Sequence, residues 1–152
     1  MSDAHEELLL AIQRLGRLMG SRNVSSRFAD AAGVEIGQQG VQLLRALLRH
    51  GELPVAGLAE AAQMDISAVS RQLRLLEDGG LVRRSASVGD GRVALVKLSP
   101  AGRRAAERIR EVGLLHLRDS LAGWSTSDTR ELARLMTRLV ADLQRTELPT
   151  GD

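Results

Sequence analysis

Hydrophobic residues recur three and four positions apart along much of the chain, and this spacing predicts amphipathic helices. The first helix is expected from about Ala4 to Gly20, with an apolar stripe of Leu8, Ile12, Leu15 and Met19. A less regular segment follows, which contains Phe28 and is interrupted by Gly33. The next helix is expected over roughly Gln38–Arg49, with its stripe at Val41, Leu44 and Leu48.

Two shorter helices are expected next, separated by a three-residue turn. Pro54 precedes the first, Val55–Ala62, whose inward-facing residues are predicted to be Leu58, Ala61 and Ala62. Asp65 can cap the second, Ile66–Asp78, because a carboxylate accepts the free backbone N–H groups at a helix start. That helix has a core stripe at Val69, Leu73 and Leu76, and the pair Gly79-Gly80 ends it.

The period of the pattern then changes from helical to alternating. Leu81–Ser85 and Val93–Leu98 are short segments of strand character, joined by a loop that contains Asp90-Gly91. Asp-Gly between two such segments is a strong signal for a β-hairpin. This hairpin is the only β structure that we expect.

Two long helices complete the chain. Ser99-Pro100 begins the first, which is expected to end near Ala122. It has two apolar seams, which indicate two packing partners. One seam consists of Ile109, Val112 and His116, and the other consists of Leu114, Leu117 and Leu121. Ser125 and Asp128 begin the last helix in a pattern like a capping box. Its apolar face is expected to consist of Leu132, Leu135, Met136, Leu139 and Leu143.

Composition narrows the class of protein. The length of 152 residues fits one domain with a sizeable core. No apolar stretch approaches the roughly 20 residues of a membrane-spanning helix, and the start of the chain is acidic where a secretory signal is basic. We therefore expect a cytoplasmic protein without a membrane partner. The chain contains no cysteine, which excludes disulfides, thiolate metal sites and cysteine redox sensing.

Charge is unevenly distributed. The chain carries a net charge of +2, but the segment from Ile66 to Arg104 has eight basic and three acidic residues, so the rest is slightly acidic. A basic segment of this kind favours a polyanionic partner. Because 20 of the 21 basic residues are arginine, a general arginine bias offers a second explanation.

The order of two short helices and a hairpin predicts a winged helix-turn-helix. In that motif the second helix enters the major groove of DNA, and the hairpin reaches the adjacent backbone or minor groove. With its apolar stripe in the core, the helix Ile66–Asp78 leaves four polar residues outside, namely Ser67, Ser70, Arg71 and Arg74. Serine hydroxyls can bond base edges and phosphates, and arginine can grip guanine with two hydrogen bonds.

Several stretches carry a resemblance to a known family. They are Leu58-Ala59-Glu60, Ile66–Arg71, Leu76-Glu77, Gly80-Leu81-Val82, Asp90-Gly91-Arg92 and Val96–Gly102. Together they resemble the helix-turn-helix and wing of the MarR family of bacterial transcription regulators, whose wing carries Asp-x-Arg ahead of Leu-Ser/Thr-x-x-Gly. The spacing agrees from about Val41 to Gly102, and the flanking helices agree in length and order.

The resemblance implies a mostly helical protein with a small β-hairpin wing (α+β), all in one chain spanning residues 1–152. Residues 38–99 would form the winged helix-turn-helix, and residues 1–37 and 100–146 would supply dimerisation helices. It further implies a homodimeric repressor that binds a pseudo-palindromic operator in double-stranded DNA. Many members of the family leave DNA when a small, often phenolic anion binds, so a small-molecule effector is a further expected partner.

Two departures from the family pattern matter. Gly91 stands where many members have a basic residue, and the tip Ser85–Gly89 has no lysine or arginine, which reduces the expected charge of the wing. The chain also has no tyrosine, one phenylalanine and one tryptophan, so an aromatic pocket for a phenolic ligand is hard to build.

The DNA-binding residues that we expect are Ser67, Ser70, Arg71, Arg74, Asp90 and Arg92. Asp90 would orient the basic side chains of the wing, while Arg92 would contact DNA or pair with Asp90. Trp124 is interpreted as a packing anchor and His116 as a packed or interfacial residue. No catalytic residue, cofactor or metal site is expected, since no phosphate loop, metal-spaced cluster or nucleophile motif is present.

Two alternatives remain open at this stage. The winged helix could serve protein–protein contact, with the same helix face docking on another protein. Within DNA binding, the chain could be an activator or a protein of low specificity that coats DNA. A gel shift separates the first alternative from DNA binding, and a footprint separates one operator from broad coverage.

Overall fold

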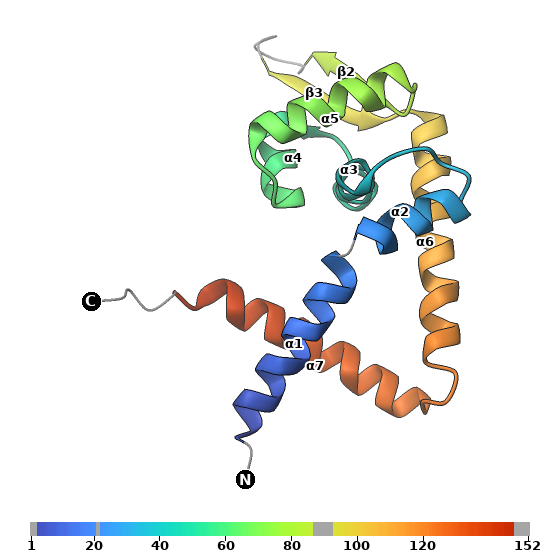
Figure 1. Cartoon of the computed structure of the whole chain (residues 1–152). Helices are drawn as coiled ribbons and strands as arrows, with labels where there is room; N and C mark the ends of the chain where they lie inside the picture. Colours follow the sequence, from blue (N-terminus) through green and yellow to red (C-terminus); the bar gives the residue numbers. More distant parts are fainter. Residues whose placement is uncertain (1–2, 21, 87–92, 148–152) are drawn as a thin grey trace. The chain divides into compact units, whose positions relative to one another are not determined.

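The computed structural model describes residues 3–20, 22–86 and 93–147. It divides into two compact units, Met1–Gly113 and Leu114–Asp152, which are treated separately below. The elements in chain order are α1 (Ala4–Gly20), α2 (Arg22–Ala31), α3 (Gln38–His50), β1 (Leu53–Pro54), α4 (Val55–Ala62), α5 (Ile66–Asp78), β2 (Val82–Ala86), β3 (Ala94–Leu98), α6 (Pro100–Ser120) and α7 (Thr126–Arg145) (Figure 1). The mostly helical fold with one small sheet is the predicted fold class.

Helix α3 lies at the centre of the first unit. It contacts α2, α4, α5 and β3, and it is seen end-on below α5 and to the right of α4 in Figure 1. Its fully buried leucines, Leu43, Leu44 and Leu47, meet Leu58 of α4 and Leu73 of α5 in one core cluster. Burying a leucine stabilises the fold by about 1.5–3 kcal/mol. The helix-turn-helix therefore has its own apolar core and presents α5 as a rigid element.

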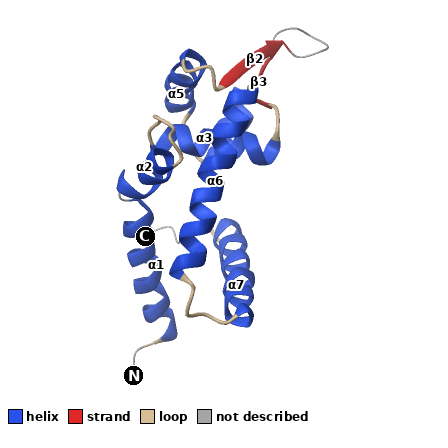
Figure 2. Ribbon diagram, turned by 90° about the vertical axis from the view of Figure 1, so that its right-hand side faces the viewer, coloured by secondary structure: helices blue, strands red, loops and turns tan. Residues whose placement is uncertain are grey.

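The sheet has three antiparallel strands in the order β1-β3-β2. In the hairpin, Val82 lies opposite Leu98 and Arg84 opposite Val96. Figure 2 shows the two strands of the hairpin projecting away from the helices. The prediction that the hairpin is the only β structure is wrong, because Leu53–Pro54 adds a two-residue edge strand against β3. Proline is tolerated there since an edge strand leaves one row of its N–H groups unpaired.

The junction between α5, β2 and α6 is unusually close. Helix α5 ends in a Schellman motif, in which the N–H of Leu81 donates to Leu76 and the left-handed Gly80 donates to Glu77. The buried hydroxyl of Ser99 donates to the carbonyl of Gly80 at 2.5 Å and accepts from the N–H of Gly102 at 3.0 Å. A Cβ on Gly102 would overlap the carbonyl oxygen of Leu81. Ser99 and Gly102 thus tie the start of α6 to the base of the hairpin.

Most other expected boundaries agree with the structure to within two residues. The irregular segment before Gly33 is helix α2, which the sequence pattern left unassigned. Helix α6 ends at Ser120, slightly before the expected end. Ala61 was expected to face inward but is exposed, while its neighbour Ala59 is buried. The cause is the short length of α4, which allows only a narrow buried face around Leu58.

The first and the last helix of the chain carry large exposed apolar surfaces. No described residue of α1 is buried, and its leucines at 8, 9 and 18 are between 46% and 62% exposed. In the second unit no described residue of α7 is buried either, although Leu132, Leu135 and Leu143 line one face. Within residues 3–20, 22–86 and 93–147, no helix is long and apolar enough to cross a membrane.

Candidate DNA-binding surface

The turn between α4 and α5 is fixed by local hydrogen bonds. Gln63 ends α4 in the left-handed conformation, at φ 52°, and Met64 donates its N–H to the carbonyl of Ala59 at 2.9 Å. Asp65 then caps α5 by accepting the N–H of Ala68 at 2.8 Å, as the sequence predicted. A cap of this kind stabilises a helix by about 1 kcal/mol.

Helix α5 has two distinct faces. Ala68, Val69, Leu73 and Leu76 are buried, whereas Ser67, Arg71 and Arg74 are exposed and Ser70 is half-buried. The residues predicted from the pattern therefore lie together on the side of α5 that faces away from the core. Among the residues that the structure describes, none of these four side chains has a hydrogen bond or ion-pair partner. The guanidinium groups are thus available to an external partner.

Two polar contacts hold α5 in position at its flanks. Gln72 donates to Gln39 of α3 across 3.1 Å, and Arg84 of β2 bonds Glu77 at 2.5 Å. Neither contact involves Ser67, Ser70, Arg71 or Arg74, and each joins α5 to a neighbouring element. They restrain the rotation of α5 about its axis, which determines where Arg71 and Arg74 point.

The tip of the wing lies outside the described residues, and with it Asp90, Gly91 and Arg92. The structure does place the strands that lead to the tip. Arg83 of β2 lies directly opposite Lys97 of β3, and both are exposed on the outer face of the hairpin. Like charges in directly opposed positions are unfavourable by themselves, and Glu52 near Lys97, at 3.6 Å, relieves only part of the repulsion. In the sequence, these two residues belong to the basic segment but were not predicted as a site. The alternation of the two strands could have predicted that they lie on the same face of the hairpin.

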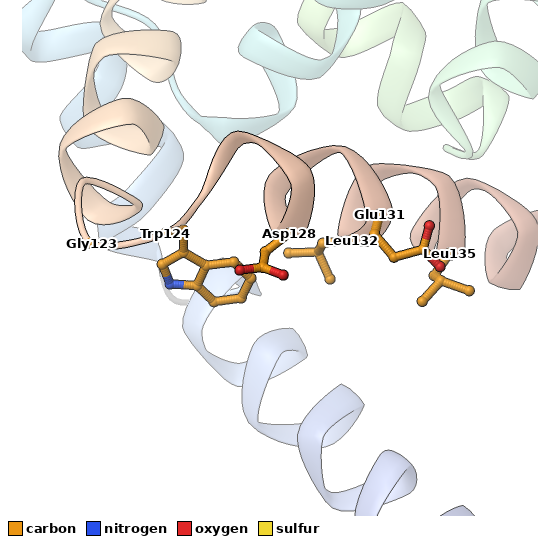
Figure 3. A pocket seen from close by; sticks show the side chains of 6 residues that line it. All are labelled: Gly123, Trp124, Asp128, Glu131, Leu132 and Leu135. Atoms are coloured by element: carbon orange, nitrogen blue, oxygen red, sulfur yellow. The ribbon is translucent and has the colours of Figure 1, made fainter.

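Trp124 does not anchor a core within the described chain. Its side chain is 49% exposed and lines a shallow pocket at the start of α7 with Leu132 and Leu135 (Figure 3). The acidic Asp128 and Glu131 border the same pocket. The guanidinium of Arg134 bonds Glu131 and lowers the pKa of that carboxyl, so Glu131 is already engaged by a cation. The apolar part of the pocket lies open.

The described part of the chain holds no group of three or more potential metal ligands. A larger cavity of about 540 Å³ lies in the first unit, between the α2–α3 linker, the end of α5 and α6. Leu75, Leu81 and Ile36 form apolar walls, Arg104 and Arg108 supply positive charge, and Glu35 supplies one carboxylate. No aromatic residue lines this cavity.

Comparison with known proteins agrees with this geometry. A sequence model of the MarR family matches residues 38–94, from the first residue of α3 to the first residue of β3. The HTH-type transcriptional repressor Mb2911 of Mycobacterium bovis is 35% identical over 99 residues, which cover 65% of this chain and 71% of that protein.

The similarity extends beyond the helix-turn-helix. The HTH-type transcriptional regulator YdgJ of Bacillus subtilis is 27% identical over 141 residues, covering 93% of this chain and 82% of that protein. The crystal structure of a MarR-family transcriptional regulator from Silicibacter pomeroyi is 26% identical, with a TM-score of 0.70 over 91% of this chain and 92% of that one. The flanking helices are therefore shared as well as the central motif.

Proposed function

The chain belongs to the MarR family of transcription regulators, and we propose that it is a homodimeric repressor that binds one pseudo-palindromic operator in double-stranded DNA. Membership makes it a DNA-binding transcription regulator rather than an enzyme. Repression, dimerisation and control by an effector are the proposed refinements, and each is supported by separate features of the molecule.

The exposed face of α5 is the observation that supports operator binding most directly. Arg71 and Arg74 lie one turn apart on a helix whose opposite face is buried in the core. Unpaired arginines on the second helix of a helix-turn-helix can donate to guanine in the major groove. We assign base contacts to these two residues, and base or phosphate contacts to Ser67 and Ser70.

The wing would contribute the flanking contacts. Arg92 is proposed to touch phosphates or the minor groove, with Asp90 holding it in orientation. This part of the proposal rests on the Asp90-Gly91-Arg92 signature in the sequence. The exposed Arg83 and Lys97 on the strands add positive charge along the hairpin that leads to that signature.

Dimerisation is supported by the apolar surfaces of α1 and α7. Monomeric proteins rarely expose contiguous apolar patches of this kind, and in this chain every described residue of both helices is at least partly exposed. We propose that residues 1–37 and 100–146 form the dimerisation region and that residues 38–99 form the DNA-binding region. A dimer places two recognition helices about one turn of DNA apart, roughly 34 Å, which matches a pseudo-palindrome.

An effector is proposed to act through the cavity of about 540 Å³ beside the end of α5. Its walls include Leu75 and Gly79, so a ligand there would contact the recognition helix itself. Arg104 and Arg108 outnumber Glu35, the one carboxylate of the lining, so the cavity favours a small carboxylate with an aliphatic body. The lining without aromatic residues argues against stacking of a phenolic ring.

A gel shift with DNA fragments from around the gene tests the proposed function. We expect one fragment to shift at nanomolar protein and to resist competition by random DNA, because specific binding exceeds non-specific binding by roughly 10³-fold or more. The Arg71→Ala variant should lose this preference. If no fragment shifts while the protein captures another protein through the same α5 face, the chain is a protein-binding winged helix instead.

A further inference from the structure

A compact basic cluster lies on the first unit, away from the exposed face of α5. Arg45, Arg49 and His50 project from α3 and, with Gln42, line a small pocket of about 210 Å³. Ala61 and Ala62 at the end of α4 form the opposite wall. No carboxylate lines this pocket, so every ionisable group that borders it is basic.

These basic groups have no anionic partner among the described residues, as is also true of Arg71 and Arg74. Arg84, Arg134, Arg138 and Arg145 each bond a carboxylate. In the described ranges, neither Arg45, Arg49 nor His50 has an ion pair or a side-chain hydrogen bond. Although Arg45 is exposed, its guanidinium is partly desolvated, which lowers its pKa and leaves its charged form less stabilised than in water. A partly desolvated charge without a counter-charge is unfavourable.

The helix dipole explains only part of the arrangement. Arg49 and His50 lie in the last turn of α3, where cations interact favourably with the free carbonyl groups. Arg45 lies more than one turn before that end, beyond the reach of this effect. The stripe of Gln42, Arg45 and Arg49, at spacings of three and four, instead aligns donors along one edge of the pocket.

We propose that this pocket binds an oxyanion of the phosphate class, held by Arg45 and Arg49 with Gln42 and His50 as further donors. The volume suits one small tetrahedral anion, and guanidinium groups match phosphate geometry with paired hydrogen bonds. The anion has two sources with the same chemistry, a phosphate of the DNA backbone or a free phosphate. The first source rests on the DNA-binding function proposed above, and the second does not depend on it.

The site adjoins the helix-turn-helix turn. Ala62 is the last residue of α4 and precedes Gln63, whose left-handed conformation sets the entry into α5. Because the C-terminal end of α4 carries partial negative charge, the attraction for an anion beside Ala61 and Ala62 must come from Arg45 and Arg49. This site lies within the α3–α4 pair and shares no lining residue with the larger cavity beside α5.

Thermal unfolding with inorganic phosphate tests the free-anion source. At constant ionic strength, phosphate should raise the melting temperature of the full-length protein in a saturable manner, while chloride should not. Arg45→Gln should weaken phosphate binding about tenfold, as expected for the loss of one hydrogen bond to a charged group. Arg110→Gln, which removes an exposed arginine of α6, is the matched control and should retain the phosphate effect.

The salt dependence of DNA binding tests the other source. If a DNA phosphate occupies the pocket, Arg45→Gln and Arg49→Gln should each reduce the slope of log K against log salt by about one. The ratio of operator to random-DNA affinity should stay unchanged, which separates this result from a failure of the proposed α5 surface.

The melting temperatures of the variants in the absence of phosphate provide a separate test of the proposal. Because Arg45→Gln removes an uncompensated charge, the variant should melt at the same or a higher temperature than the wild type. Arg49→Gln, one turn later on α3, provides a second variant that does not depend on the fold tolerating a change at Arg45. The site is overturned if neither variant alters the phosphate effect or the salt slope relative to Arg110→Gln.

Discussion

Arg71 is the side chain to which we assign the largest part in sequence-specific binding. It is exposed on the face of α5 opposite the buried Val69 and Leu73, and nothing in the described structure engages its guanidinium. Arg74, one turn later, is also exposed, whereas Ser70, which precedes Arg71, is half-buried. In the proposed complex the two arginines read neighbouring bases, and the serine is restricted to contacts along the edge of the helix.

Arg71→Ala should weaken binding to the operator by about 1–3 kcal/mol, and by less to random DNA if the side chain reads a base. Fluorescence anisotropy on both DNAs measures the two losses. Since Arg71 is exposed, the variant should unfold within about 0.5 kcal/mol of the wild type, and Arg110→Ala serves as the charge-matched control. Equal losses on both DNAs would reassign Arg71 to a phosphate.

Arg92→Ala tests the wing at the same scale. If Arg92 touches phosphates or enters the minor groove, the variant should bind all DNA more weakly and lower the salt slope by about one. A titration at several salt concentrations gives both values. Unchanged affinity and slope in a folded variant would make Arg92 a structural partner of Asp90, and the strand residues Arg83 and Lys97 would then carry the charge of the wing.

At the scale of elements, the parts that the sequence predicted best are those with local signals. Asp65, Ser99 and Ser125 each cap the helix that they were expected to cap, and Gly80 ends α5 in the left-handed conformation. Capping depends on residues within three positions, so it can be recognised without tertiary information.

The elements that the sequence did not reveal depend on distant contacts. The described side chains of α2 that pack on the core include Ala29 and Phe28, at adjacent positions that form no visible helical period. Strand β1 consists of two residues that pair with β3, some forty positions later in the chain. The pocket around Arg45 could not be predicted for a similar reason, because the end of α4 forms one of its walls. Arg45 and Arg49 also lie outside the basic segment Ile66–Arg104.

Gly102 provides an element-scale prediction. Since a side chain there would overlap the carbonyl of Leu81, Gly102→Ala should destabilise the protein by about 3 kcal/mol. Urea denaturation measures the loss, and Gly123→Ala is the control, because nothing lies within 4 Å of its added Cβ. If Gly102→Ala were as stable as Gly123→Ala, the start of α6 would not be fastened to the base of the wing as described.

At the scale of the whole molecule, the proposed function depends on the pairing of two chains. Deletion of residues 1–20 removes the exposed apolar face of α1 and should prevent stable dimerisation. Specific binding should disappear with it, because a single recognition helix reads only half of a pseudo-palindrome. Sedimentation and anisotropy together test this, and a truncated protein that remains dimeric and binds the operator normally would assign dimerisation to other helices.

A DNase footprint on the fragment that shifts in the gel assay is the most direct test of the account. A homodimeric repressor predicts one protected segment whose two halves are related by pseudo-two-fold symmetry, with centres about 34 Å apart along the duplex. Arg71→Ala at the same concentration should leave this segment unprotected. Protection spread evenly over the fragment, or one half-site protected without its symmetric partner, would contradict the account.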